Sequence, residues 1–96
     1  MDIKGLASQG RDIWGEKPMS LDEIVAVIGV VYGDICREAR RSHEGGVVND
    51  EELQKELGNL IFSCIRWCRD LGYDPEECVV LAQKAQAKYA SRLGKH

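Results

Sequence analysis

The chain has 96 residues, of which 44% are hydrophobic and 30% are charged, as is ordinary for one small globular domain. Its 13 basic and 16 acidic residues give a formal net charge of -3, which argues against nucleic acid as a partner, because phosphate recognition needs a concentrated basic surface. No apolar stretch approaches the roughly 20 residues of a membrane span, and no basic leader precedes an apolar segment. We therefore expect a cytoplasmic protein that binds neither nucleic acid nor a membrane.

The N-terminal segment, residues 1–19, predicts one short helix. Apolar side chains recur at helical spacing between residues 2 and 14, and Gly15 and Pro18 then end the pattern.

A strong start signal opens the second segment. Ser20 and Glu23 have the spacing of a capping box, and Met19 can pack on Ile24 as a hydrophobic staple. Apolar residues then recur at steps of three and four, which predicts a helix over residues 21–41. They occupy more of the helix surface than a single stripe, so we expect this helix to be covered on two sides.

The third segment follows a loop that contains two adjacent glycines. Asn49 and Glu52 predict the start of a helix over residues 50–71, and Gly72 suits the position just after its end. Asp74 and Pro75 then predict the start of a fourth helix.

This last helix should end before Gly94, and residues 94–96 should fray. The expected fold is all-α: an antiparallel bundle of three main helices plus a short N-terminal helix, completed by dimerisation. The whole chain, residues 1–96, forms a single domain, and residues 20–92 form its core.

The chain contains four cysteines and no pair spaced as Cys-x-x-Cys. The simplest interpretation is that Cys36, Cys64, Cys68 and Cys78 are small buried apolar residues in a reducing compartment. A zinc site with His43 as a further ligand is the alternative, although the spacing matches no known zinc module.

Glycines interrupt two of the predicted helices. Gly29 and Gly33 lie in the second helix, and Gly58 lies in the third. Each glycine costs about 1 kcal/mol relative to alanine inside a helix, which suggests a compensating reason. We expect a close helix crossing, either as plain packing or beside a ligand pocket.

Acidic residues form one row on each of the two long helices. Asp34 and Glu38 are four residues apart on the second helix, and Glu52, Glu56 and Asn59 share a face of the third. If the helices pack antiparallel, the rows can converge on a hard cation such as Mg²⁺. The alternative is a solvated acidic face paired with nearby arginines and lysines.

Residues 20–92 resemble the MazG-like all-α nucleoside triphosphate pyrophosphohydrolases. The most specific part is KELGNLIFSCIRWCRDLGYDPEEC, residues 55–78, which is similar to the family's Glu-Glu-Leu-Gly-Asp, apolar helix and Leu-Gly-Ile-Asp. The resemblance implies a helical bundle completed by dimerisation, sometimes as a dimer of dimers. It also implies Mg²⁺-dependent cleavage of a nucleotide between its α and β phosphates, with release of pyrophosphate.

The family holds its metal with a Glu-Glu-x-x-Glu row and a Glu-x-x-Asp row, and this chain departs from both. Val30 and Val31 stand at the first two acids, and Asp34 replaces the third. Glu56 matches the first acid of the other row, and Asn59 replaces its aspartate. Because phosphoanhydride hydrolysis of this kind needs the metal, the departures imply weak Mg²⁺ binding and lost or strongly reduced activity. They also suggest that the two valines fill part of the former pocket.

The end of the fourth helix is similar to the family's Lys-Asn-x-x-Arg-Tyr. Lys84 and Lys88 are therefore candidates to bind a nucleotide phosphate, and Tyr89 to contact phosphate or sugar. Trp14 is a candidate to stack on the base, whereas Trp67 lies on an apolar stripe and should be core. The alternative is a purely structural role, in which Tyr89 is the last core residue of the helix and both lysines are exposed to solvent.

Three hypotheses of function follow. The first is a dimeric nucleotide-binding or regulatory module that has lost hydrolase activity. The second is a divergent but active Mg²⁺-dependent pyrophosphohydrolase, with Asp34, Glu38, Glu52 and Glu56 in an altered metal site. The third is an unrelated helical oligomerisation module. The missing Glu-Glu pair favours the first over the second, and the ELGN motif with the helical glycines disfavours the third.

Overall fold

The computed structural model describes residues 1–94 and has, over this range, four helices and no strand. The expected all-α class is confirmed, and the helix bounds lie within two residues of the expected ones. Lys95 and His96, where fraying was expected, lie outside the described residues. The helices are α1 (Ile3–Trp14), α2 (Leu21–His43), α3 (Asp50–Asp70) and α4 (Pro75–Arg92).

The helices begin at the side chains that the sequence indicates. The Ser20 hydroxyl accepts a hydrogen bond from the Glu23 backbone N–H at 3.2 Å, and the Glu23 carboxylate accepts one from the Ser20 N–H at 3.1 Å. The Asn49 side chain accepts from the Glu52 N–H at 3.0 Å, and Asp74 caps α4 in the same manner. These bonds satisfy backbone donors that have no partner within the first turn of a helix.

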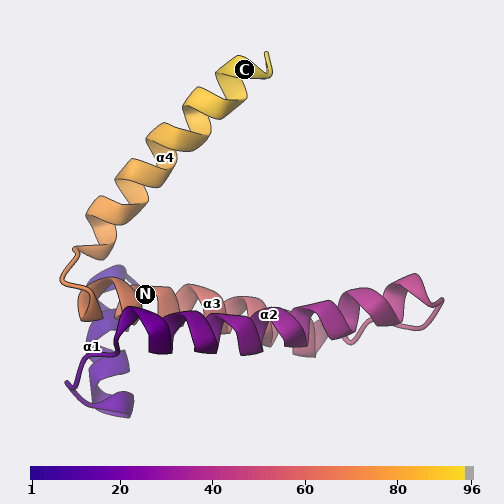
Figure 1. Cartoon of the computed structure of the whole chain (residues 1–96), viewed down its shortest axis with the longest axis horizontal. Coiled ribbons are helices and arrows are strands. Elements are labelled where there is room, and N and C mark those ends of the chain that lie inside the picture. The colour runs from indigo at the N-terminus through magenta and orange to yellow at the C-terminus, as the bar shows by residue number, and fades with distance from the viewer. Residues whose placement is uncertain (95–96) are drawn as a thin grey trace.

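The two long helices run antiparallel and lie side by side, and α1 packs against α3 near the end where α2 begins (Figure 1). The buried core is small. Trp67 is 5% exposed, which confirms its expected place in the core. The buried apolar side chains of the described chain are Ala7, Ile24, Ile65 and Trp67.

The last helix departs from the expected bundle. α4 leaves the layer formed by α2 and α3 at a wide angle instead of packing back along α3 (Figure 1), and Pro75 at its start is the residue of α4 that is buried. The short loop between α3 and α4 therefore does not make them antiparallel neighbours. The radius of gyration is 16.0 Å, against about 12.5 Å for a compact domain of this length. One chain alone does not complete the bundle.

The long helix α2 is not covered on two sides within one chain. Val25, Val30 and Tyr32 are each more than half exposed. Within residues 1–94, no atom lies within 4 Å of where a Cβ would stand on Gly29, Gly33 or Gly58, apart from their own helix and chain neighbours. The expected close crossing at these glycines is therefore not formed inside the chain.

The cysteines are less buried than expected. All four lie within the described range: Cys36 and Cys64 are exposed, and Cys68 and Cys78 are partly buried. The last three lie along a groove between α1, α3 and α4, where no second layer of helices covers them. No described helix is both long enough and apolar enough to span a membrane.

Candidate functional site

The contact between α2 and α3 carries the two acidic rows that the sequence predicts. Glu38 of α2 and Glu56 of α3 are each only 5% exposed. Asp34 and Glu52 lie near them and are partly buried. Because burying a carboxylate costs free energy unless it is paired, the partners of these groups decide what the cluster can bind.

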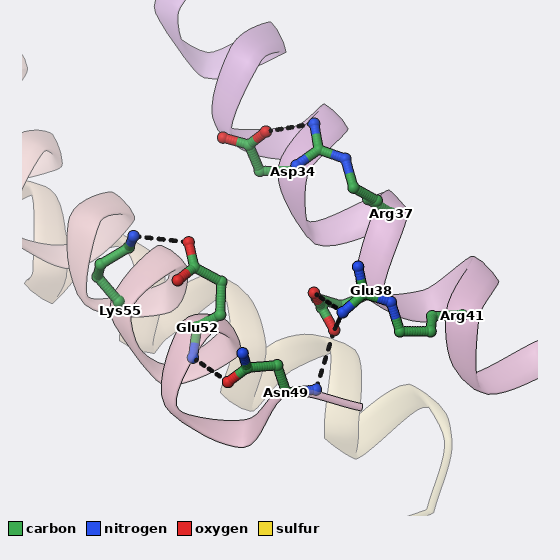
Figure 2. A network of polar contacts seen from close by, with 7 residues as sticks. All are labelled: Asp34, Arg37, Glu38, Arg41, Asn49, Glu52 and Lys55. Carbon is green, nitrogen blue, oxygen red and sulfur yellow. Dashed lines mark hydrogen bonds and ion pairs between the residues drawn. The ribbon is translucent and has the colours of Figure 1, made fainter. Parts of the chain in front are cut away.

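Glu38 ties α2 to the start of α3. Its carboxylate accepts a hydrogen bond from the Asn49 backbone N–H at 3.0 Å and lies 3.1 Å from the guanidinium of Arg41 (Figure 2). Both carboxylate oxygens therefore already have a donor. The partners satisfy a buried charge and hold the α2–α3 loop.

The other carboxylates are paired as well. Asp34 lies 3.0 Å from the Arg37 guanidinium, and Glu52 lies 2.6 Å from the Lys55 ammonium (Figure 2). The hydrogen bond from Glu52 is the main cause that raises the pKa of Lys55, and the negative charges of Glu56 and Asp34 add to it. Asp34 on α2 is thus close enough to contribute to the raised pKa of Lys55 on α3.

Glu56 has the longest contact with a cation among the four acidic residues. Its carboxylate accepts a hydrogen bond from the Asn59 side-chain amide at 3.3 Å and lies 3.9 Å from the Lys55 ammonium. The amide at position 59 therefore donates to the carboxylate of its own helix. An aspartate at this position would instead add a second anionic ligand beside Glu56.

The donor set does not fit a resident Mg²⁺. Among residues 1–94, no group of three or more His, Cys, Asp or Glu side chains is placed to hold a metal ion. Each acidic side chain already pairs with a cation or an amide donor through at least one oxygen, and Mg²⁺ demands near-ideal octahedral oxygen ligands. Val30 is 66% exposed, so the expected filling of the pocket by this valine is wrong, whereas Val31 is partly buried.

A cavity of about 320 Å³ lies beside the cluster, between α1, the start of α2 and the second half of α3. Trp14 is 64% exposed at its edge, and the Arg66 guanidinium lies over the Trp14 ring at 5.6 Å from the ring centre. Arg66 is held by Asp70 at 3.4 Å. The lining residues are Gly10, Trp14, Met19, Val27, Phe62, Ser63, Arg66 and Trp67.

This cavity adds residues that the sequence reasoning missed. Arg66 and Asp70 are four residues apart, a spacing that favours an ion pair on one helix face. This spacing is the sequence feature from which the ion pair could have been predicted. A cationic guanidinium on an aromatic face is a stabilising arrangement, and it fixes the orientation of the exposed ring.

The cavity and the acidic cluster lie along the same face of α2. Val27 lines the cavity and Asp34 belongs to the cluster, seven residues later. At 1.5 Å per residue this separation is about 10 Å along the helix axis. The cavity thus lies about two helical turns from the acidic cluster.

The candidate phosphate-binding residues are not part of this site within one chain. Lys84, Lys88 and Tyr89 lie on the portion of α4 that leaves the other helices, and all three are exposed. Tyr89 is therefore not the last core residue of a closed bundle in the single chain. His43 is exposed at the end of α2 and lies beside no cysteine cluster that could hold zinc within the described residues.

Comparison with protein-family models, with curated proteins and with solved structures gives no match. The resemblance to the MazG-like family therefore rests on sequence motifs alone, chiefly those of residues 55–78.

Proposed function

We propose that this chain is a dimeric nucleotide-binding module of MazG-like type whose pyrophosphohydrolase activity is lost or strongly reduced. The observation that carries the proposal is the cavity edged by Trp14, which lies about two helical turns from the acidic rows. An aromatic face stacks on a base with little selectivity, and Arg66 holds that face in place.

Loss of activity follows in this proposal from the pairing of the carboxylates. Arg37, Arg41 and Lys55 neutralise the acidic side chains, and Asn59 replaces a potential ligand by an amide donor. Without a bound metal ion, the site lacks the positive charge that offsets the negative charge developing during phosphoanhydride cleavage. Any Mg²⁺ would bind weakly and arrive with the triphosphate.

Lys84, Lys88 and Tyr89 remain candidates to bind the phosphates. Since α4 leaves the rest of its own chain, these residues belong to the site in this proposal only when a second copy brings them there. A dimer, or a dimer of dimers, is thus part of the proposal.

The test combines binding and turnover. Calorimetric titration with a panel of ribo- and deoxyribonucleoside triphosphates, with and without Mg²⁺, should show binding, while pyrophosphate release with Mg²⁺ or Mn²⁺ should stay at background. Trp14→Ala should weaken binding by about 1–3 kcal/mol, the usual loss for a stacking aromatic residue. Tyr32→Ala, which removes another exposed aromatic side chain from α2, is the matched control and should bind as the parent does.

Two results contradict the proposal. Turnover that disappears in Glu56→Ala would mean an active enzyme with a rebuilt metal site. Absence of binding for every nucleotide would favour a second candidate, a helical oligomerisation module. That candidate is supported by the apolar side chains that α2 and α4 leave exposed in the single chain.

A further inference from the structure

The isolated chain exposes too much surface for its size. Its solvent-accessible area is 7520 Å² for a mass of 10.7 kDa, whereas a compact monomer of this mass exposes about 5,500 Å². The excess is therefore about 2,000 Å². A standard stable interface buries about 800 Å² on each partner, and obligate homodimers bury more.

α4 is exposed along most of its length: apart from Pro75, Cys78 and Ala90, its residues are all exposed. The helix has 18 residues, and Pro75 is its buried residue. Helices in proteins owe most of their stability to packing, and an isolated helix of this length is marginal in water. A well-formed α4 without a covering layer therefore points to a partner that packs on it.

The angle between α3 and α4 opens on an apolar groove of about 490 Å³. None of its lining residues carries a charge. They come from α1, from α3 and from the first half of α4, and include Ile61, Cys64 and Cys68 on α3 with Cys78, Val79 and Ala82 on α4. Such a groove favours an apolar helix as its occupant rather than a charged ligand.

The chain itself offers a matching helix. Along α4, Cys78 and Ala82 line the groove, and Ala85 continues the same face three residues further along the helix. The two alanines keep that face shallow, which allows a second helix to approach closely. The apolar face of α4 thus forms one wall of the groove in its own chain. The same face can also pack into the groove of a second chain.

We propose that α4 of a second copy occupies the groove between α1, α3 and α4, and that the two chains exchange this contact symmetrically. A two-fold dimer uses the same patch on both partners, as a self-complementary groove and ridge require. The contact turns two open chains into one closed bundle. This inference rests on the dimeric part of the proposed function and adds the surface that forms the dimer.

A second apolar stripe on α2 is the competing location. Leu21, Val25, Ile28 and Tyr32 follow one another at helical spacing and are exposed. This stripe lies on a single helix and lines none of the groove between α1, α3 and α4. We therefore place the interface at the groove and α4. A variant in the α2 stripe tests the competing location.

The experiment is sedimentation of the full chain over a range of micromolar concentrations. The parent protein should be a dimer. Ala82→Glu and, separately, Ile61→Glu should each raise the dissociation constant by at least about 100-fold, because two unpaired carboxylates per dimer would enter an apolar interface. Val47→Glu, an equal change of charge on the exposed α2–α3 loop, should leave the dimer intact.

Circular dichroism and the melting temperature complete the test. A parent dimer should melt at a temperature that rises with protein concentration. The groove variants should lose at most the helical content of α4, whose cover they remove, and keep that of the other three helices. A parent that is monomeric throughout the range would overturn the inference. So would a dimer that survives both groove variants, or one that is lost with Val25→Glu alone.

The outcome also separates this inference from nucleotide binding. A dimer that behaves as expected but binds no nucleotide keeps the interface and removes the proposed ligand. A monomer that binds nucleotide with the expected dependence on Trp14 keeps nucleotide binding. It removes both the interface and the dimeric part of the proposed function.

Discussion

The carboxylate of Glu38 on α2 accepts a hydrogen bond from the backbone N–H of Asn49, the residue whose side chain caps α3. One buried acid thereby joins two helices and fixes the point where the second begins. Arg41 supplies the positive charge that makes burial of this carboxylate acceptable. The acidic row of α2 thus has a structural role at Glu38.

Replacement of Glu38 should therefore destabilise the fold. Glu38→Ala leaves the Asn49 N–H and the Arg41 guanidinium without their partner, and we expect the free energy of unfolding to fall by about 1–3 kcal/mol. Urea denaturation followed by circular dichroism measures this change. Glu44→Ala removes an exposed ion pair with Arg40 and should change stability by less than about 0.5 kcal/mol. Equal effects of the two variants would contradict the structural role.

The two tryptophans should differ sharply in their access to solvent. Trp67 is buried in the core between the helices, whereas Trp14 lies exposed at the edge of the cavity with Arg66 on one face. Acrylamide should quench Trp14 emission much more strongly than Trp67 emission. Trp14→Phe isolates the buried residue and should show a blue-shifted spectrum with weak quenching. Strong quenching in that variant would show that the core is open.

The helices could be predicted because their signals are local. The Ser20–Glu23 capping box and the Asp74–Pro75 start depend on residues within one turn, so the sequence shows them directly. The direction of α4 depends on what covers it, and a short loop alone does not fix that direction. The expected antiparallel packing was therefore right for α2 and α3 and wrong for α3 and α4, although each helix was placed correctly.

The candidate site was predictable in part for the same reason. Helical spacing puts Asp34 and Glu38 on one face, and the structure turns that face toward α3, where Glu38 accepts a hydrogen bond from the Asn49 N–H. The spacing does not reveal which basic side chain pairs with each acid. The cavity was not predictable, because it is formed by α1, whose packing angle on α3 has no signal in residues 1–19.

Cys68 should be a poorly reactive thiol. Burial in the groove, together with the neighbouring Cys78 thiol, raises the pKa of Cys68 from its ordinary 9.0 to about 11. Because the thiolate is the nucleophile, iodoacetamide at pH 8 should alkylate Cys68 much more slowly than the exposed Cys36. Mass spectrometry of peptides over time measures both rates, and a Cys36→Ser variant confirms the assignment. Equal rates at the two cysteines would show that the groove is open to solvent.

The same shift predicts a dependence of stability on pH. A pKa that is higher in the folded chain means that folding favours the protonated thiol, so this contribution is complete below about pH 9. It is lost as the pH rises through the folded value near 11. The melting temperature of the parent should therefore fall more steeply over this interval than that of Cys68→Ala, which has no thiol to ionise. Parallel curves would contradict the assignment.

Gly33 tests whether the helical glycines serve a contact between copies. In the single chain, a Cβ at this position meets no atom within 4 Å among the described residues beyond its own helix and chain neighbours. Gly33→Ala should then stabilise α2 by about 1 kcal/mol, the difference in helix propensity between the two residues. Gly46→Ala is the control and should destabilise, because its Cβ would stand 3.0 Å from the Arg41 carbonyl oxygen. If Gly33→Ala instead dissociates the dimer or lowers its melting temperature, a partner helix approaches α2 closely at this glycine.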